Sequence, residues 1–466
     1  MRLFATSLCT FRPWPVALAA GLLCAHAAPA AQPPGPAAVP AAAAVQSTPE
    51  EQVTQLYLTM LNRIPDPAGL AYWSQVIRDG GTSDTVAAGI EDSPEYIHLT
   101  RGLPPTTHNY WVSPYGSDTS AGTKDKPFKT LARAVQAAQQ PSTTVWVAPG
   151  VYTGGLKTTA HGTATGRIIW AATSKWAASL VQPTHSSTST AWDNRGDYVS
   201  IVGFDVDGSK LPQTGPVWRI GLYTGGSHSV IERNRVHHIA NTSAYQCTSG
   251  GGSGINVDSY YKGVNGEVRS NVVHDIGKSD CTYVQGIYFS TTGAVRNNVV
   301  HRIGEAAIHL WHDAHDIEIV NNTLTSSKYG IIVGGGNYYY WSKDLGGANF
   351  VDVHNNLIYD NTYGVSEQGD TGTSNTYYNN LVMQNPGYSW SLRAGMRHYN
   401  TVACVPPAPC DPKFVAYSRS APLPDVHLRP DSPAIGRGIG TYAPPVDADG
   451  KPRNASTGYD IGAYQH

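Results

Sequence analysis

Three short segments of similar pattern carry polar or aromatic side chains at their third and fifth positions. They are GINVD at 254–258, GIYFS at 286–290 and AIHLW at 307–311. Alternate residues of a strand face the same way, and neighbouring coils of a stacked repeat lie ~4.8 Å apart. We therefore expect one compact outward patch, extended by adjoining turns. Its members are Asn256, Asp258, Tyr288, Ser290, His309 and Trp311, with Tyr261, Lys262, His312 and Asp313 from the turns.

This patch has the side chains that β-elimination of a uronate requires. The reaction needs a base beside the carboxylate, a group that holds the carboxylate and an acid for the leaving oxygen. His309 or Lys262 could be the base, Tyr288 the acid and Asn256 the carboxylate ligand, while the Trp311 ring could stack on a sugar. Further substrate contacts could come from Tyr261 and His312.

Two other interpretations of the patch stay open. Asp258 and Asp313 could be the carboxylate pair of a glycoside hydrolase. Outward Tyr, His and Asp side chains also occur on inert solenoid faces, where they have no catalytic role. Flanking repeats carry Gly and Ile at the same positions, so we expect the patch to end there.

A second column of side chains could bind a metal. His237, His274 and His301 each lie three residues after a recurring Asn, so they should stack on successive coils. Three imidazoles in a row could hold a transition metal. A ladder that the repeat imposes on one sheet face is the other interpretation, and the sequence leaves the metal unknown.

The repeat that positions these side chains is marked by asparagine. Its spacings are 37, 27, 24, 34 and 24 residues, between Asn234, Asn271, Asn298, Asn322, Asn356 and Asn380. Each unit reads as an Asn turn, a strand, a turn and a Gly-Ile strand, which leaves no room for a helix. Stacked units bury a core that one unit cannot, and their Asn side chains can hydrogen-bond along the column. The sequence predicts an all-β, right-handed, single-stranded parallel β-helix; the 24-residue minimum period argues against tandem hairpins.

The register of the repeat predicts which residues form its core. Ile255, Ile287, Ile308 and Ile331 should be buried and stacked. An amphipathic helix at 128–139 should cap the open end of the solenoid, with Leu131, Val135 and Ala138 on its apolar face.

Four cysteines follow the first 30 residues, and an even count in an exported chain favours disulfides. Cys247 precedes Gly254 by seven residues and Cys281 precedes Gly286 by five, so both fall in the same turn one coil apart. The coil spacing fits a disulfide between them. We also expect a bridge between Cys404 and Cys410.

The beginning of the chain is of a different kind. Residues 1–30 have the charge, apolar core and small residues of a secretory signal peptide, and 31–48 form an Ala/Pro-rich linker. Residues 49–101 predict short helices. The string QLYLTMLNRIPDPAGLAYW, followed by GIEDSPEY, resembles the phycobilisome-linker-like module known as domain of unknown function 4214. The resemblance implies a role in protein or cell-surface attachment.

Charge and composition narrow the choice of partners. Removing Arg2 and Arg12 with the expected signal peptide leaves 30 of the 32 Lys and Arg residues. Against 34 acidic residues, this gives a net charge of −4. The chain has no basic stripe, so we expect no nucleic-acid partner. No later run of residues suits a membrane span, so we expect a secreted monomer.

Residues 108–466 resemble secreted pectate-lyase-like β-helix proteins. The opening YWVSPYGSDTSAGTKDKPFKTLARAVQAA, followed by VWVAPGVYTGG, is similar to the entry of polysaccharide lyase family nine. That family uses a Lys base and a calcium ion held by clustered Asp residues, and its Asp motif is not recognisable here. The resemblance implies an extracellular lyase acting on an acidic polysaccharide such as pectate. A hydrolase, a uronan epimerase and a non-catalytic adhesin remain alternatives on the same scaffold.

Overall fold

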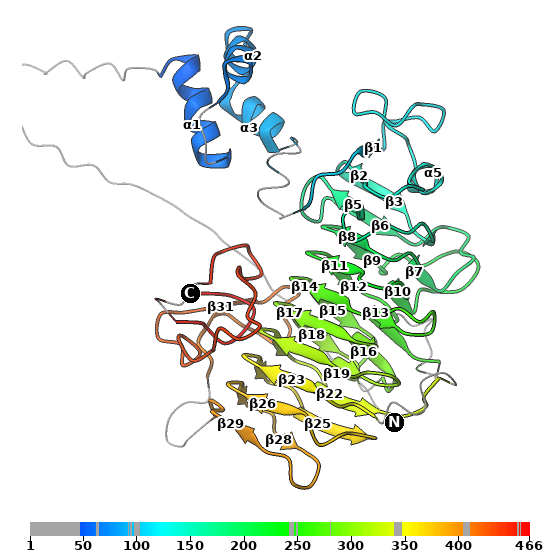
Figure 1. Ribbon diagram of the computed structural model, residues 1–466, viewed down its shortest axis with the longest axis vertical. Helices are drawn as coiled ribbons and strands as arrows, with labels where there is room; N and C mark the ends of the chain where they lie inside the picture. The colour runs from blue at the N-terminus through cyan, green and yellow to red at the C-terminus, as the bar shows by residue number, and fades with distance from the viewer. Residues whose placement is uncertain are drawn as a thin grey trace, which may run out of the picture. The chain divides into compact units, whose positions relative to one another are not determined.

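The computed structural model contains a small helical unit and a long β-helix (Figure 1). The residues that it describes are 47–61, 65–91, 93, 96, 103–241, 247, 250–279, 281–339, 347–403, 411–453, 456 and 458–466. The expected signal peptide, most of the linker and the Cys404–Cys410 bridge lie outside these residues. None of the described helices is long and apolar enough to cross a membrane.

The helical unit comprises α1 (Pro49–Leu61), α2 (Pro67–Arg78) and α3 (Ser83–Glu91). Asp66 caps α2 because its side chain accepts a hydrogen bond from the Gly69 amide at 2.9 Å, and Pro67 occupies the first helical position. A small core joins α1 to α3. Its buried members are Val53, Tyr57, Val86 and Ile90.

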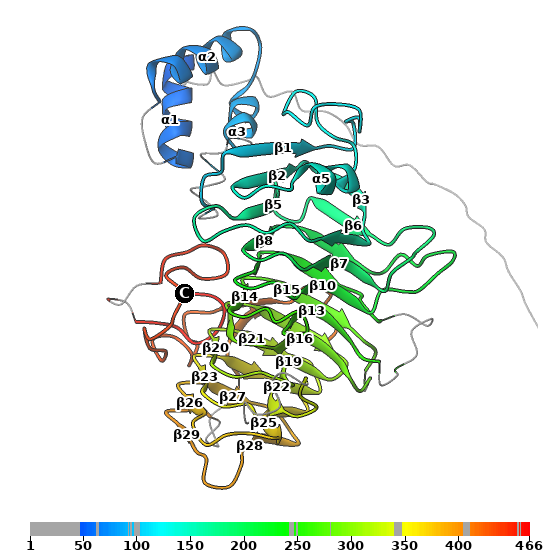
Figure 2. The same ribbon diagram turned by 45° about the vertical axis from the view of Figure 1, so that its right-hand side comes forward.

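From residue 108 onward, the described strands form three parallel sheets that wind into a solenoid (Figure 2). Sheet 1 has eleven strands: β1 (His108–Val112), β2 (Thr143–Val147), β5 (Ile168–Ala172), β8 (Val199–Val202), β11 (Val230–Glu232), β14 (Gly266–Arg269), β17 (Gly293–Arg296), β20 (Ile317–Val320), β23 (Val351–His354), β26 (Thr376–Tyr378) and β29 (His398–Tyr399).

Sheets 2 and 3 have nine described strands each. Sheet 2 contains β3 (Gly150–Thr153), β6 (Ala178–Val181), β9 (Asp205–Asp207), β12 (Arg235–His237), β15 (Val272–Ile276), β18 (Val299–Ile303), β21 (Thr323–Thr325), β24 (Leu357–Tyr359) and β27 (Leu381–Met383). Sheet 3 contains β4 (Leu156–Thr158), β7 (Thr190–Asn194), β10 (Ile220–Thr224), β13 (Gly252–Asp258), β16 (Val284–Ser290), β19 (Ala306–Leu310), β22 (Tyr329–Gly335), β25 (Tyr363–Gly369) and β28 (Tyr388–Ser391).

Each coil therefore has three strands where the sequence predicted two. The additional strand belongs to sheet 1 and immediately precedes the recurring Asn, as β14 precedes Asn271. Strands such as β11 are three residues long, and their alternation of apolar and charged residues is too short to stand out. The pairing of successive coils is parallel throughout these sheets, as a β-helix requires.

The predicted core register is confirmed. Ile255 pairs with Ile287, Ile287 with Ile308 and Ile308 with Ile331, and all four are completely buried. The Asn column also forms the expected ladder: Asn298, for example, donates from Nδ2 to Asn322 Oδ1 at 3.0 Å. Because these amides are buried, the ladder satisfies polar groups that would otherwise be costly to bury.

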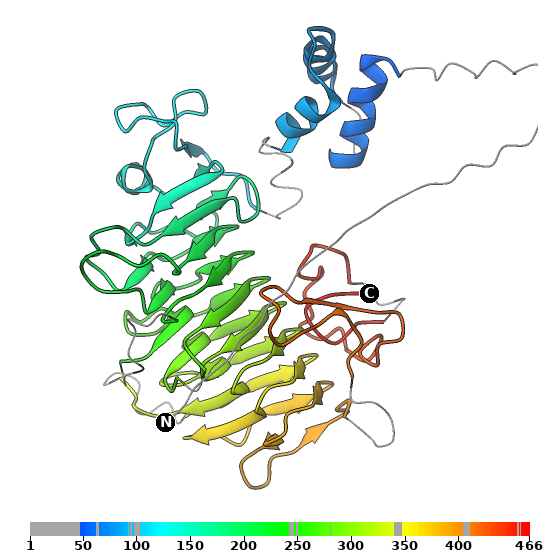
Figure 3. The ribbon, with the colours of Figure 1, turned by 180° about the vertical axis from the view of Figure 1, so that it is seen from behind.

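The solenoid is covered at its beginning and along sheet 2. The expected helix is α5 (Leu131–Ala137), shorter than 128–139; Thr130 caps it, and Leu131 and Ala134 are buried. The segment 411–466 contains the antiparallel pair β30 (Phe414–Ala416) and β31 (Asp425–Leu428) and lies against the solenoid (Figure 3). Its apolar residues pack on outward residues of sheet 2, including Leu357 and Leu381.

Candidate functional site

The outward face of sheet 3 presents the predicted column. Tyr223 pairs with Asn256, Asn256 with Tyr288, and Tyr288 with His309. The column continues through Ile332 to Ser366. The sequence therefore correctly predicted which side chains follow one another across the coils of sheet 3.

Aromatic contacts hold the central residues together. The Tyr288 and His309 ring centroids are 5.5 Å apart, and those of His309 and Trp311 are 5.6 Å apart. His312 packs edge-on to Tyr288 at 6.1 Å and stacks on Tyr339 at 5.0 Å. Four predicted residues and one tyrosine that the sequence analysis missed thus form a continuous cluster.

His309 lies at the base of this cluster. Its side chain is 9% exposed although the strand alternation places it on the outward side. Burial lowers the pKa of His309 to about 3, with a smaller effect from His312. The imidazole is therefore neutral near pH 7 and too weak a base to take a proton from a sugar carbon.

His312 has the properties that His309 lacks. It is half-buried at the end of the cluster and adopts a positive φ of 51°. Its Nδ1 lies 2.8 Å from the carbonyl oxygen of Asn337. Because a carbonyl only accepts, Nδ1 carries the proton, and in the neutral ring Nε2 has the lone pair.

Asp258 is the most highly connected carboxylate of the patch. Its Oδ1 accepts hydrogen bonds from Ser290 Oγ at 3.1 Å, Tyr339 Oη at 3.0 Å and the Tyr260 amide at 3.0 Å. Asp313 is also buried, and its Oδ2 accepts from Ser259 Oγ at 2.6 Å. Ser259, which follows Asp258 directly in the chain, therefore holds the Asp313 carboxylate at the same turn.

The tyrosines around these carboxylates stay protonated at neutral pH. Burial, followed by the charge of Asp258, raises the pKa of both Tyr288 and Tyr339 well above its ordinary value. Burial and Asp370 raise the pKa of Tyr338 to about 12. Each of these hydroxyls can therefore donate a hydrogen bond, or a proton, to a developing alkoxide.

The turn after β13 supplies the remaining predicted residues. Tyr261 is 41% exposed, packs edge-on to Tyr223 and lies under the Arg195 guanidinium at 4.2 Å. Lys262 is exposed, adopts a positive φ of 63° and donates its backbone amide to Ser259. Asn256 is half-buried. These three line the side of the patch toward the beginning of the chain.

The patch does not end at the glycines, which corrects the sequence analysis. The Trp311 ring lies on Gly334, where a Cβ atom would be 2.7 Å from the indole, and on Gly369 at the same distance. A larger residue at either position would collide with the ring. The glycines therefore extend the patch onto the next two coils instead of ending it.

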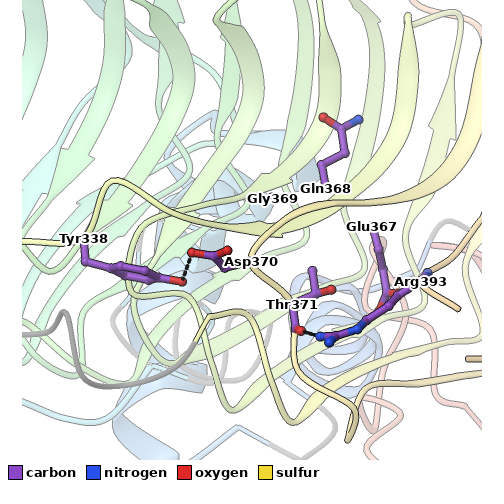
Figure 4. Close-up of a pocket in the computed structure, with 7 residues that line it drawn as sticks. All are labelled: Tyr338, Glu367, Gln368, Gly369, Asp370, Thr371 and Arg393. Carbon is purple, nitrogen blue, oxygen red and sulfur yellow. Dashed lines mark hydrogen bonds between the residues drawn. The ribbon is translucent and has the colours of Figure 1, made fainter. Parts of the chain in front are cut away.

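Beyond Trp311 lies an open pocket of about 610 Å³ (Figure 4). Tyr338 Oη donates to Asp370 Oδ2 at 3.2 Å on one side, and the exposed Arg393 donates to the Thr371 carbonyl on the other. Glu367 is occupied by Tyr377 Oη at 2.7 Å and the Arg393 amide at 2.7 Å. The sequence analysis missed this pocket. The tyrosine-rich insert at 337–340 was the available signal.

The expected disulfide lies beside the patch. Cys247 and Cys281 are bonded, with their Cα atoms 5.3 Å apart. They join the turns that precede β13 and β16, the two strands that carry Asn256 and Tyr288. The bridge therefore links the two turns that lead from sheet 2 into sheet 3.

Family models match three separate segments of the chain. Residues 42–100 match a domain of unknown function (DUF4214), 115–159 match a protein of unknown function (DUF1565), and 218–324 match the right handed beta helix region. Together with the parallel sheets, the last match decides the fold class. The chain is a right-handed parallel β-helix protein.

One solved structure supports this fold assignment. The β-helix protein is similar to pectate lyase Pel9A, with a TM-score of 0.53 and 17% identity over 78% of this chain and 97% of that one. A rhamnogalacturonan lyase matches with a TM-score of 0.39 and 14% identity over 66% and 91%. The Azotobacter vinelandii mannuronan C-5 epimerase AlgE4 A-module matches with 0.40 and 18% over 61% and 71%. No curated protein matches the sequence.

The metal-ligating side chains of this β-helix protein do not fit the calcium site that its resemblance to polysaccharide lyase family nine implies. Calcium prefers six to eight oxygen ligands, several of them carboxylates. Within the described ranges, one group of three metal-ligating side chains has its donor atoms within 4.8 Å of one another, and it contains two imidazoles: Asp207, His237 and His238. No step of the chemistry below is therefore assigned to calcium.

Proposed function

We propose that this protein is an extracellular polysaccharide lyase that cleaves a uronate-containing glycan across the outward face of sheet 3. The observation that carries the proposal is the surface from Tyr261 through His312 and Trp311 to Arg393, which combines stacking rings, an imidazole and a cation. The shared fold with pectate lyase Pel9A supports the same class of substrate. The disulfide supports an exported protein.

In this proposal His312 is the base. The hydrogen bond to the Asn337 carbonyl uses Nδ1 of His312, so it does not occupy the Nε2 lone pair. The base removes the proton beside the uronate carboxylate, and the electron pair forms the double bond as the C–O bond to the leaving sugar breaks. Tyr338 or Tyr339 donates the proton that the leaving oxygen needs, since both hydroxyls are protonated at neutral pH.

Arg393 and Trp311 position the substrate. A guanidinium has five N–H donors in a planar fork, so its bond to the Thr371 carbonyl leaves capacity for a uronate carboxylate. Holding the carboxylate near a cation stabilises the charge that develops when the adjacent proton leaves. Trp311, whose ring is fixed against Gly334 and Gly369, offers an edge and a face to a sugar ring.

A second candidate function rests on one specific observation. Asp258 and Asp313 are both buried, and Ser259, the residue after Asp258, donates its hydroxyl to Asp313 at 2.6 Å. Two carboxylates held in different environments are the requirement of a glycoside hydrolase. In this alternative, one is the acid and the other the base or nucleophile.

A glycan panel separates these possibilities. Polygalacturonate, polymannuronate and polyguluronate are compared with neutral glycans, and each reaction is followed both at about 235 nm, where an unsaturated uronate absorbs, and by new reducing ends. The proposal predicts both signals on an acidic glycan. Reducing ends without absorbance would indicate the hydrolase, and retention on a glycan gel without either signal would indicate a binding protein.

A further inference from the structure

A second cluster of functional side chains lies on sheet 2, away from the proposed catalytic face. Asp207 ends β9 and His237 ends β12, and the two are register partners on adjacent strands. His238 follows at the corner of the coil with a positive φ of 56°. His237 Nδ1 is 2.7 Å from His238 Nδ1 and 3.5 Å from Asp207 Oδ1.

The other nitrogen of His237 is already fixed. Its Nε2 lies 3.0 Å from Asp205 Oδ1, and a carboxylate only accepts, so Nε2 carries the proton. Arg235 donates to the same carboxylate at 2.7 Å. The His237 ring is thus oriented with its Nδ1 lone pair toward His238 and Asp207.

We propose that Asp207, His237 and His238 bind a divalent transition metal, with Zn²⁺ as the ion that this donor set suits best. Two imidazole nitrogens and one carboxylate oxygen are three ligands of a tetrahedral zinc site with one open position. Asp205 acts through His237 in the manner of the carboxylate that orients a metal-bound imidazole. This proposal is independent of the proposed lyase function.

Binding requires a small local adjustment. In the ion-free cluster, a proton lies between the two Nδ1 atoms at 2.7 Å. With zinc, the neutral His238 ring carries its proton on Nε2, so both Nδ1 lone pairs face the ion. Zn–N bonds of about 2.0–2.1 Å place tetrahedral ligands about 3.3 Å apart, so the two nitrogens separate by a few tenths of an ångström.

The histidine column that the sequence indicated is not this site. His237, His274 and His301 do stack as expected, with ring centroids 5.0 Å apart at each step and interplanar angles of 3° and 7°. Parallel rings at this spacing hold corresponding nitrogens about 5 Å apart. One ion cannot bind both, because two Zn–N bonds span at most about 4.2 Å. The metal is bound by the end of the column and the corner beside it.

Metal titration of the full chain, purified without a polyhistidine tag and treated with chelator, tests the proposal. We expect one Zn²⁺ per chain by calorimetry, with micromolar or tighter affinity, and a visible Co²⁺ spectrum typical of tetrahedral coordination. His238→Asn removes a ligand while Asn tolerates the positive φ, and we expect affinity to fall at least about 100-fold. Asp205→Asn should lower it about 10–100-fold.

The matched control is His228→Asn. His228 also has a positive φ, 54°, and stacks on Tyr198 in a different turn, so the same substitution should leave metal affinity unchanged. The proposal is overturned if the wild-type chain shows no saturable binding of either ion. It is equally overturned if His238→Asn binds as well as His228→Asn, or if His274→Gln abolishes binding while His238→Asn does not.

Discussion

The outward faces of sheets 2 and 3 are built from the same coils but use their positions differently. On sheet 2 one position repeats the same residue, as in His237, His274 and His301, and its rings stack in parallel. On sheet 3 the equivalent column changes its chemistry at every coil, from Tyr223 through Asn256 to His309. A repeated residue allows identical rings to stack on successive coils, whereas a column of different residues brings side chains of different chemistry together.

What covers each face also differs. The segment 411–466 packs apolar side chains on part of sheet 2. Over sheet 3, the residues that cover the column are aromatic and polar: Trp311, His312 and Tyr339. The apolar cover stabilises the solenoid, whereas the polar cover lowers the exposure of His309, and an open pocket lies beyond Trp311. The predictions that follow test this division between the two faces.

Replacing the proposed base should have the largest effect. His312→Gln should lower kcat on an acidic glycan by about 10²–10⁴-fold, the usual contribution of a general base. That loss corresponds to about 2.7–5.5 kcal/mol of activation free energy. Steady-state rates at about 235 nm, with thermal unfolding as a check of the fold, measure it. Full activity in His312→Gln would move the base elsewhere, with Lys262 as the next candidate.

Removing the disulfide should cost about 3–4 kcal/mol of unfolding free energy. The Cys247–Cys281 bridge closes a loop with a sequence separation of 34, which restricts the unfolded chain. The Cys247→Ser/Cys281→Ser double variant should therefore unfold at lower urea concentration than the oxidised parent. Adding reductant to both proteins is the control, because it should bring the parent to the level of the variant. Equal stability before reduction would contradict the predicted contribution.

Breaking the asparagine ladder should be next in size. Asn298 is completely buried, and its side chain bonds to Asn322 and to the Val268 and Arg296 carbonyls. Asn298→Ala removes these bonds and also the Oδ1 acceptor that the buried Asn271 backbone amide uses at 3.0 Å, at a cost of about 1–3 kcal/mol. Gln213→Ala, which removes a side-chain amide at an exposed position, should change stability by less than about 0.5 kcal/mol. Urea denaturation of both variants decides whether the ladder carries this energy.

A single methyl group added at Gly334 tests whether Trp311 positions the substrate on sheet 3. Its Cβ would lie 2.7 Å from the Trp311 ring and 2.9 Å from the Gln368 carbonyl, so the ring must move. We expect Gly334→Ala to raise KM about tenfold, about 1.4 kcal/mol, with kcat less affected. An unchanged KM would show that Trp311 does not position the substrate.

The smallest effect concerns the closing segment. His427 lies 2.8 Å from Asp449 and 2.6 Å from Asp425, and these hydrogen bonds raise the pKa of His427 to about 9. The ionised histidine is stabilised by folding, so its contribution is complete below pH 6.5 and is lost as the pH rises through about 9. Because the side chain is 43% exposed, solvent screening keeps it below about 1 kcal/mol. The melting temperature of the parent should fall between pH 6.5 and 9 partly because this contribution is lost. That part of the fall should be missing in His427→Gln.

The sequence predicted the solenoid because its signals are periodic. The Asn phase fixed the register, and the register correctly placed Ile255 against Ile287 and Cys247 beside Cys281. The third strand of each coil was missed because three- and four-residue strands such as β11 and β14 carry too few residues for a detectable period. The local sequence pattern therefore predicted the buried core, but not the number of strands in each coil.

The candidate site was only partly predictable because it depends on an insert. Alternation of strand residues placed Tyr288 and His309 on one column. It could not show that His309 would be covered, since the Trp311 ring packs against His309 and the insert that carries Tyr339 places a further ring on His312. Arg393 follows β28, three coils beyond β19, and reaches the pocket only through the fold.

The most direct test is a crystal structure of His312→Gln with an acidic oligosaccharide, since a slowed enzyme holds its substrate. We expect sugar density along sheet 3, with a ring on Trp311, a uronate carboxylate on Arg393 and the scissile bond beside residue 312. Density confined to the outward face of sheet 2, or a carboxylate bound away from Arg393, would contradict the assignment of the site to sheet 3.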